Sequence, residues 1–278
     1  RMEKAVNRGD CRPRGIELGS HRADVLVAAG AMGFDGKGYW WQRPFRWLGW
    51  VNPKGLTIVT KSLTRHARVG NWRWWAPWRA VRTLGGGNMV NAMGLPNRGL
   101  PWWLETRLPG MSRAGLAVVP SLWADNPEDM AAMVRDLYDT AASAIVGIEI
   151  NLSCPNTGDD KGLSLLTDIA NAAIDAARGR LPIIAKLGHG GFNMELGGYL
   201  DGKVAALSLI NTVPWDIIYP FTPSPLAKYG YSGGVSGPAI IGYARGMTAW
   251  AGMCLKHSGV ISGGGIRTLG ELRYRLSL

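Results

Sequence analysis

The amino-acid sequence predicts an α/β protein whose parallel strands close into a (β/α)8 barrel. Seven short apolar runs rich in Val, Ile, Leu and Ala recur along the 278 residues, without strict alternation of apolar and polar positions. Such runs are typical of strands buried on both faces, as in a parallel sheet. The runs are residues 23–30, 55–62, 115–121, 144–153, 181–188, 204–212 and 259–265.

Helix-like stretches separate several of these runs. Residues 126–143 begin with Asn126, a good N-cap residue. Residues 165–179 end at Gly179, which suits the left-handed conformation that follows many helices. Residues 237–256 form a third predicted helix. Strands that alternate with helices predict successive βα units around a parallel sheet.

Polar and small residues gather at the C-terminal ends of six predicted strands. In a closed barrel these ends meet at one face, where the loops build the active site. The alternative, a doubly wound open sheet, would concentrate function at one switch point. The spread over six strands therefore favours the barrel. The residues concerned are Ala29, Gly30, Lys61, Ser62, Asn151, Cys154, Lys186, Asn211, Thr212, Gly263, Gly264 and Gly265.

Composition narrows the class of protein. The formal net charge of +11 favours anionic partners, such as nucleic acid, phosphate cofactors, acidic lipids or carboxylate substrates. No block of five or six consecutive basic residues occurs, so no nucleic-acid-binding tail is predicted. The three cysteines form no CxxC pair and the four histidines have no metal-ligand spacing, which predicts a reducing compartment and no metal site. No transmembrane segment is predicted, because no apolar run reaches roughly 18 residues.

Cys154 is the first candidate for chemistry. It lies in the polar segment 151–157, NLSCPNT, directly after a predicted strand. A free thiol has a pKa of about 8.5 and can act as a nucleophile or a base near neutral pH. For Cys11 and Cys254 we expect the buried, apolar environment that is usual for a free cysteine.

Asparagines and lysines supply the other candidates. Amide side chains both donate and accept hydrogen bonds, so several around one cavity would suit a pyrimidine ring, although a single asparagine is commonly a turn residue. Lys61 and Lys186 end apolar runs, and each is either a surface lysine with a buried stem or a cation that faces a carboxylate, a phosphate or a flavin. The glycine-rich segment 262–266 can bring backbone N–H groups close to a phosphate. The asparagines are Asn91, Asn151, Asn156 and Asn211.

Together these motifs resemble the dihydroorotate dehydrogenase family, whose members are FMN-dependent (β/α)8 barrels. The combination of NLSCPN (151–156) with NAMGLPN (91–97) is specific, and the matching segments keep the family's order over nearly the whole chain. These segments are residues 28–30, 60–71, 91–99, 151–157, 185–188, 210–212, 233–240 and 263–266.

The resemblance implies oxidation of dihydroorotate to orotate in pyrimidine biosynthesis, with Cys154 as the base and FMN as the hydride acceptor. The implied substrate-binding residues are Lys61, Asn91, Met93, Gly94, Leu95, Asn151, Asn156, Asn211 and Thr212. The implied FMN-binding residues are Ala29, Gly30, Lys61, Ser62, Asn91, Asn151, Lys186, Ser236, Gly237, Gly264 and Gly265.

A cysteine base is typical of the cytoplasmic class 1 members of that family, whereas membrane-associated, quinone-linked members have a serine. Class 1 implies a homodimer, or an iron–sulfur and FAD electron-transfer subunit as a partner, with fumarate or NAD as the acceptor. Any iron–sulfur centre would lie on another chain, because this one has no cluster-binding cysteines. The alternatives are a dihydropyrimidine dehydrogenase-like flavin reductase and a flavin-free barrel that acts only as a binding module.

Two features depart from the family pattern. Only 12 residues follow Ile266, so we expect the single FMN-binding domain, residues 1–278, to be truncated before its last βα unit. In addition, eight of the 13 tryptophans lie in residues 40–50 and 72–78. They are expected either to pack long loops over the barrel mouth or to contact another protein or a membrane.

Overall fold

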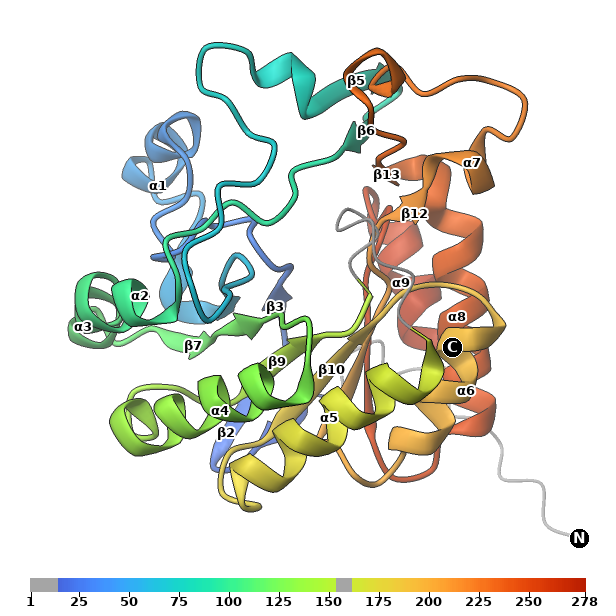
Figure 1. Cartoon of the computed structure of the whole chain (residues 1–278). Coiled ribbons are helices and arrows are strands. Elements are labelled where there is room, and N and C mark those ends of the chain that lie inside the picture. Colours follow the sequence, from blue (N-terminus) through green and yellow to red (C-terminus); the bar gives the residue numbers. More distant parts are fainter. Residues whose placement is uncertain (1–14, 154–161) are drawn as a thin grey trace, which may run out of the picture.

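The computed structural model describes residues 15–153 and 162–278 (Figure 1). Cys11, Cys154 and Asn156 therefore lie outside the described residues. Within these ranges the parallel strands form two ladders, ordered β3-β4-β7 and β8-β9-β10-β11-β14. Their bounds are β3 Leu26–Val27, β4 Thr57–Val59, β7 Ala117–Val119, β8 Ser121–Leu122, β9 Ile148–Asn151, β10 Ile183–Leu187, β11 Ala206–Leu209 and β14 Gly259–Ser262.

The two ladders form one continuous row. Pro120 alone separates β7 from β8, and a parallel bridge between Leu63 and Leu122 joins the ladders. All seven apolar runs therefore contain a strand, and the strands follow one another around the row in sequence order, as the predicted barrel requires. Within the described residues β3 pairs only with β4, and β14 only with β11.

Helices cover the outside of this row (Figure 1). The predicted helices are confirmed with small shifts of their ends: the Asn126 side chain accepts a hydrogen bond from the Asp129 N–H at 2.8 Å, and Gly179 has a φ of +65°. The third predicted helix starts at Ile241, after a 3-10 turn. The helices are α1 Arg43–Trp47, α2 Leu100–Thr106, α3 Leu108–Arg113, α4 Pro127–Ala141, α5 Leu163–Ala177, α6 Gly191–Leu200, α7 Trp215–Ile218, α8 Ile241–Cys254 and α9 Leu269–Ser277.

A short hairpin closes the N-terminal end of the barrel strands. It consists of β1 (Ile16–Leu18) and β2 (His21–Ala23), which the sequence did not predict as a separate unit. Its buried residues pack against inward-facing residues of the barrel strands and form with them a small core inside the barrel. A separate, larger core lies between the strands and the helices. The residues of the interior core are Leu18, Ala23, Val59, Val119, Ile184 and Ala206.

A four-stranded antiparallel sheet stands at the opposite end, above the C-terminal ends of the barrel strands (Figure 1). The sequence analysis did not predict it. It brings the segment before α2 against the segment after β11, because β6 pairs with β13. The strands are β5 Val81–Gly85, β6 Asn88–Asn91, β12 Val213–Pro214 and β13 Gly234–Ser236.

Two expectations about burial are wrong. Every one of the eight tryptophans in residues 40–50 and 72–78 is exposed, from 39% for Trp72 to 89% for Trp47, so these side chains do not pack down over the barrel mouth. Cys254, expected to be buried, is exposed at the end of α8, where a helix has a solvent-facing side. None of the helices within the described ranges is long and apolar enough to cross a membrane.

Replacing Leu137 by alanine should test the core beneath α4. Leu137 is fully buried, and a buried Leu→Ala change typically costs about 2–5 kcal/mol of unfolding free energy through lost burial and the cavity left behind. Urea unfolding followed by far-UV circular dichroism measures this loss. Leu269→Ala removes the same atoms from a side chain that is 72% exposed and should change stability by less than about 0.5 kcal/mol; equal losses in both variants would contradict this description of the core.

Candidate active site

A chain of hydrogen bonds crosses the C-terminal ends of the barrel strands. Asn211 Nδ2 donates to Asn151 Oδ1 at 3.3 Å, and Asn151 Nδ2 donates to Ser62 Oγ at 3.3 Å. Ser62 Oγ lies 3.2 Å from Ser121 Oγ. Ser121 Oγ donates to Glu149 Oε1 at 2.8 Å. Because the Ser121 proton goes to Glu149, the Ser62 hydroxyl must donate to Ser121, so every donor in the chain points toward the Glu149 carboxylate.

This chain joins three of the predicted site residues to two that the sequence analysis missed. Ser62, Asn151 and Asn211 were predicted, and their side chains connect in the structure. Ser121 and Glu149 were not predicted, although an acid inside the apolar run 144–153 was visible in the sequence. Glu149 is only 3% exposed. A buried carboxylate needs hydrogen-bond donors, and the chain supplies one.

Asn211 also forms a hydrogen bond with the segment that follows β9. Its Nδ2 donates to the Ser153 carbonyl at 2.8 Å, and its Oδ1 accepts from the Thr212 N–H at 2.9 Å. Ser153 Oγ donates to the Lys186 carbonyl at 3.4 Å. Ser153 is therefore bonded both to β10 and to the segment that follows β11. Thr212 Oγ1 is buried and finds no hydrogen-bond partner within the described part of the chain, which favours a ligand there because an unpaired buried hydroxyl is costly.

Lys61 follows β4 and is a half-buried cation. Its Nζ lies 5.4 Å from the centre of the Phe34 ring, and burial lowers the pKa of the ammonium to about 8. Across residues 15–153 and 162–278, no carboxylate forms a salt bridge with it. A partly desolvated charge without a counter-ion costs free energy, and an anionic ligand would reduce that cost. The partial burial of the ammonium favours the interpretation of Lys61 as a cation that faces an anionic ligand.

Three other predicted residues lie close to these groups. Gly30 has a φ of +82°, and a Cβ there would approach Lys61 Cγ to 3.4 Å. Ala29 packs against the interior core of the barrel. Lys186 on β10 stands opposite Asn151 on β9 in the strand register. The exits of β3, β4, β9 and β10 thus bring their predicted site residues to the same end of the barrel.

The loop after β6 approaches from the antiparallel sheet. Asn91 Nδ2 donates to the Gly234 carbonyl at 3.4 Å, while the Met93 carbonyl accepts from the Asn71 N–H at 2.8 Å and the Leu95 carbonyl from Asn97 Nδ2 at 2.8 Å. Gly94 and Leu95 both have positive φ, which is unusual for leucine. Asn71 and Asn97 were missed, although they stand in residues 60–71 and 91–99, two of the segments that resemble the family.

The glycines that were predicted to bind the cofactor also lie close together. A Cβ on Gly265 would lie 3.0 Å from the Gly237 carbonyl oxygen, and both residues have positive φ. The buried Arg275 holds this region, because its Nη2 donates to the Gly264 carbonyl at 2.9 Å while its Nε pairs with Glu271 Oε1 at 2.7 Å. No pattern in the sequence indicated that Arg275 belongs to the site. Ser236 precedes Gly237 on β13, where its Oγ lies 3.5 Å from the Met89 carbonyl.

The described residues include no group of three or more His, Cys, Asp or Glu side chains that could hold a metal ion. Among these residues the arrangement instead offers a half-buried cation, convergent amides and an unpaired hydroxyl at the mouth of a barrel. Such a site can bind and orient a polar, anionic ring compound.

The comparisons with known proteins agree with this geometry. The family model described as dihydroorotate dehydrogenase matches residues 22–271. A protein of Thermoanaerobacter sp. strain X514, named dihydroorotate dehydrogenase B (NAD(+)), catalytic subunit, is 32% identical over 248 residues, which cover 87% of this chain and 76% of the relative. A protein of Solibacter usitatus, provisionally named dihydroorotate dehydrogenase A (fumarate), is 34% identical over 190 residues, covering 66% of this chain and 59% of that protein.

Among solved structures, a crystal structure of DHODH from Eimeria tenella in complex with ferulenol has a TM-score of 0.64. It covers 98% of this chain and 78% of that chain, at 15% sequence identity. Similarity at this level of identity supports the barrel fold.

Stability should depend on the protonation of Lys61. Its pKa is about 8 in the folded protein and 10.5 in its ordinary state. Between these values the unfolded chain binds a proton that the folded protein has lost, so the unfolding free energy should rise with pH, by on the order of 3 kcal/mol in total. Lys61→Met should abolish this rise and make the protein more stable than the parent at pH 7. Urea unfolding from pH 7 to 10.5 measures both effects.

The exposed Lys54 provides the control for losing one positive charge. Lys54→Met should keep the rise of stability with pH. A rise that survives in Lys61→Met would show that the Lys61 ammonium is not desolvated in the folded protein.

Proposed function

The chain belongs to the dihydroorotate dehydrogenase family, and we propose from this premise that it oxidises dihydroorotate to orotate in pyrimidine biosynthesis. One observation of the site supports this substrate most directly. The half-buried Lys61 lacks a counter-ion among the described residues and lies at the end of the barrel where the amides of Asn151 and Asn211 converge. Dihydroorotate carries both a carboxylate and a ring of alternating C=O and N–H groups.

The reaction removes a proton from C5 and a hydride from C6 of the substrate ring, and a C5=C6 double bond forms. We propose Cys154 as the base that takes the proton. The chain's contribution to placing this base is the hydrogen bonding of the segment before it, since Asn211 holds the Ser153 carbonyl and Ser153 in turn reaches the Lys186 carbonyl. A cysteine whose thiol pKa lies near the working pH is partly ionised, and its thiolate can accept the proton without a histidine partner.

The substrate carboxylate is proposed to lie against the Lys61 ammonium and the backbone of Met93, Gly94 and Leu95. The ring would be held by amide groups that can each donate and accept hydrogen bonds. Thr212 Oγ1, buried and unpaired within the described ranges, would gain a partner when the ring binds. The ring-binding amides are proposed to be Asn91, Asn151, Asn156 and Asn211.

The residues present are suited to FMN, which would accept the hydride when bound. The positive φ of Gly237, Gly264 and Gly265 allows a close backbone approach to a phosphate group, and Arg275 fixes the Gly264 carbonyl. The other proposed contacts come from the exits of the barrel strands and from the neighbouring β6 and β13. They are Ala29, Gly30, Lys61, Ser62, Asn91, Asn151, Lys186 and Ser236.

We further propose that the chain is a single FMN-binding barrel domain that works in the cytoplasm. One relative is named as the catalytic subunit of dihydroorotate dehydrogenase B (NAD(+)), and another as an A (fumarate) form. The first supports an electron-transfer partner subunit with an iron–sulfur centre and FAD, and the second is compatible with a homodimer that uses fumarate. Supplying NAD with a partner subunit, or fumarate alone, as the acceptor in steady-state assays distinguishes the two.

Anaerobic addition of dihydroorotate to the purified, FMN-loaded protein tests the function. The flavin absorbance should bleach as the substrate is oxidised. Cys154→Ala should slow this bleaching by about 100-fold or more, in line with the contribution of a positioned general base, while FMN stays bound. Cys254→Ala, which alters an exposed cysteine on α8, should bleach like the parent. Bleaching at the parent rate in Cys154→Ala would reject Cys154 as the base.

The role of Lys61 predicts a difference between two substrates. Dihydrouracil has the same ring as dihydroorotate but no carboxylate. Lys61→Met should raise the KM for dihydroorotate about 10- to 100-fold, because a hydrogen bond to a charged group contributes about 1.5–3 kcal/mol. Any slow turnover of dihydrouracil should change far less. A parent protein that prefers dihydrouracil would instead favour a dihydropyrimidine dehydrogenase-like activity.

A further inference from the structure

The net positive charge of the chain comes from one segment. Residues 36–104 contain eleven Lys and Arg residues and no Asp or Glu, whereas the rest of the chain contains 20 basic and 20 acidic residues. The whole formal net charge of +11 therefore lies in 69 of the 278 residues. We call residues 36–104 the acid-free segment. Its basic residues are Lys37, Arg43, Arg46, Lys54, Lys61, Arg65, Arg68, Arg73, Arg79, Arg82 and Arg98.

The same segment exposes large apolar side chains in two places. The first tryptophan segment is residues 39–51 and includes α1; the second is residues 69–78. Proteins rarely leave such groups of side chains in water unless they form an interaction site. The exposed side chains of the first segment are Tyr39, Trp40, Trp41, Phe45, Trp47, Leu48, Trp50 and Val51. Those of the second are Val69, Trp72, Trp74, Trp75 and Trp78.

Both tryptophan segments lie at the same end of the molecule. Figure 1 shows α1 and the chain leading into β5 at the end that carries the antiparallel sheet, away from the β1–β2 hairpin. In the first segment the Tyr39 and Trp41 rings stack with 4.5 Å between their centres. In the second, the Trp74 and Trp75 rings meet edge to face at 5.7 Å. Local ring contacts therefore hold these side chains against each other while leaving them exposed.

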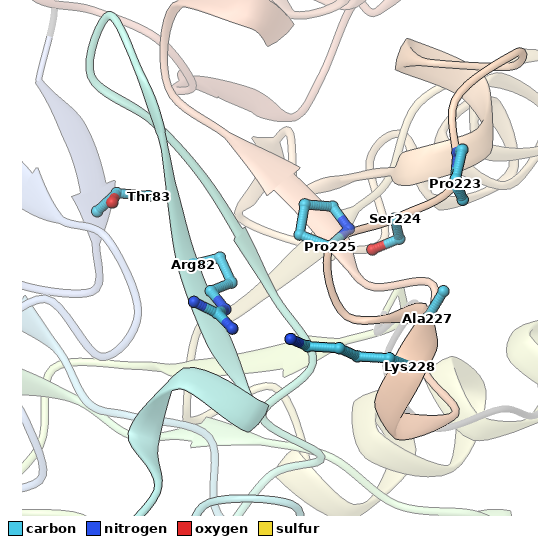
Figure 2. Close-up of a pocket in the computed structure, with 7 residues that line it drawn as sticks. All are labelled: Arg82, Thr83, Pro223, Ser224, Pro225, Ala227 and Lys228. Atoms are coloured by element: carbon cyan, nitrogen blue, oxygen red, sulfur yellow. The ribbon is translucent and has the colours of Figure 1, made fainter.

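A basic pocket adjoins the second tryptophan segment. It has a volume of about 570 Å³ and is lined by Arg82 and Thr83 of β5 and by Pro223, Ser224, Pro225, Ala227 and Lys228. Figure 2 shows the Arg82 and Lys228 side chains pointing toward one another across it. Arg82 Nε is buried and has no hydrogen-bond partner within residues 15–153 and 162–278. An anionic group between the two cations would supply that partner.

Contacts tie this pocket to the tryptophans. The Arg79 guanidinium and the Lys228 ammonium each lie 5.2 Å from the centre of the Tyr229 ring. Arg79 follows Trp78 in the 3-10 turn Pro77–Arg79 that leads into β5. Cations that can meet an anionic group therefore stand directly beside an exposed indole.

We propose that the acid-free segment docks this protein on an anionic lipid membrane, with the tryptophans entering the interface and the Arg82–Lys228 pocket receiving a lipid phosphate. Trp is favoured at membrane interfaces, and each Lys or Arg near an anionic leaflet adds attraction. The aliphatic Leu48, Val51 and Val69 are also exposed. A lipid surface would take them up, whereas nucleic acid offers stacking only to rings.

The net positive charge of the acid-free segment disfavours two other occupants of this surface, namely a second copy of the chain and residues 1–14. Asp129 and Asp125, which lie outside the segment, pair with Arg65 and Arg68, but no residue of the segment itself is acidic. A second copy bound through the same surface would therefore bring cations against cations, which repel. Residues 1–14 of the chain carry five basic and two acidic residues, so they do not neutralise the surface either. The surface therefore fits a large anionic partner. An anionic bilayer is such a partner, because its headgroups attract the cations and its interface accepts the exposed apolar side chains.

Vesicle flotation with the full chain tests this docking. We expect the protein to float with phosphatidylcholine vesicles that contain phosphatidylglycerol, to float poorly with pure phosphatidylcholine, and to be released by salt because exposed charges are screened. The indole fluorescence should shift to the blue on binding. Absence of binding to phosphatidylglycerol vesicles, or equal binding to both kinds that salt does not reduce, would overturn the proposal.

Variants distinguish docking through the acid-free segment from nonspecific adsorption to vesicles. The double change Trp47→Ala and Trp74→Ala should lower the vesicle partition coefficient by at least about tenfold, because each change removes a large apolar side chain from the interface. Met253→Ala alters an apolar side chain that is 79% exposed on α8, outside the acid-free segment, and should bind like the parent. Arg82→Gln with Lys228→Gln should weaken binding about fivefold per cation removed.

Two further outcomes would reject a lipid partner. One is binding of a single-stranded oligonucleotide that outcompetes phosphatidylglycerol vesicles. The other is a dimer by gel filtration that the Trp47→Ala and Trp74→Ala changes dissociate. Far-UV circular dichroism of each variant shows that lost binding does not reflect lost folding, since all altered side chains apart from Arg82 are exposed.

Discussion

The Glu149 carboxylate sets the direction of the hydrogen bonds on which the site is built. It is the terminal acceptor of a chain that runs from Asn211 through Asn151, Ser62 and Ser121. Because this acceptor is buried, each hydroxyl along the chain is committed to donate in one direction. The amide oxygen of Asn151 and the carbonyl of Ser153 then both accept from Asn211. The orientation of the amides is thus determined at the far end of the network.

The site depends on two sheets with different roles. The parallel barrel places Lys61, Asn151, Lys186 and Asn211 at one end because the C-terminal ends of its strands meet there. The antiparallel sheet then carries the Met93–Leu95 loop over this end, and hydrogen bonds to Asn71 and Asn97 hold the loop in a left-handed conformation. The barrel therefore supplies fixed side chains, while the second sheet supplies backbone.

Charge and apolar surface are divided unevenly around the molecule. The end that holds the site is bordered by a segment with no acidic residue, and this segment leaves eight tryptophans exposed. The half-buried cation Lys61 belongs to the same segment. The conversion that the family membership indicates uses an anionic substrate, and an electropositive border raises the local concentration of anions. The proposed contact with anionic lipid would place this end of the barrel toward the membrane surface.

The sequence by itself determined the strands and the main helices, because continuous apolar runs and an N-cap such as Asn126 act over a few neighbouring residues. It also placed the strand-exit residues at one end, since parallel strands in a barrel leave little choice. The sequence did not identify four residues of the site, and it did not show that the tryptophans are exposed. The four residues are Glu149, Arg275, Asn71 and Asn97. Their roles come from contacts between distant parts of the chain, such as Ser62 with Ser121, 59 residues apart, and Asn151 with Ser62, 89 residues apart. Only the tertiary structure decides these contacts, because a hydrogen bond or a covering surface between distant segments leaves no pattern in the residues on either side.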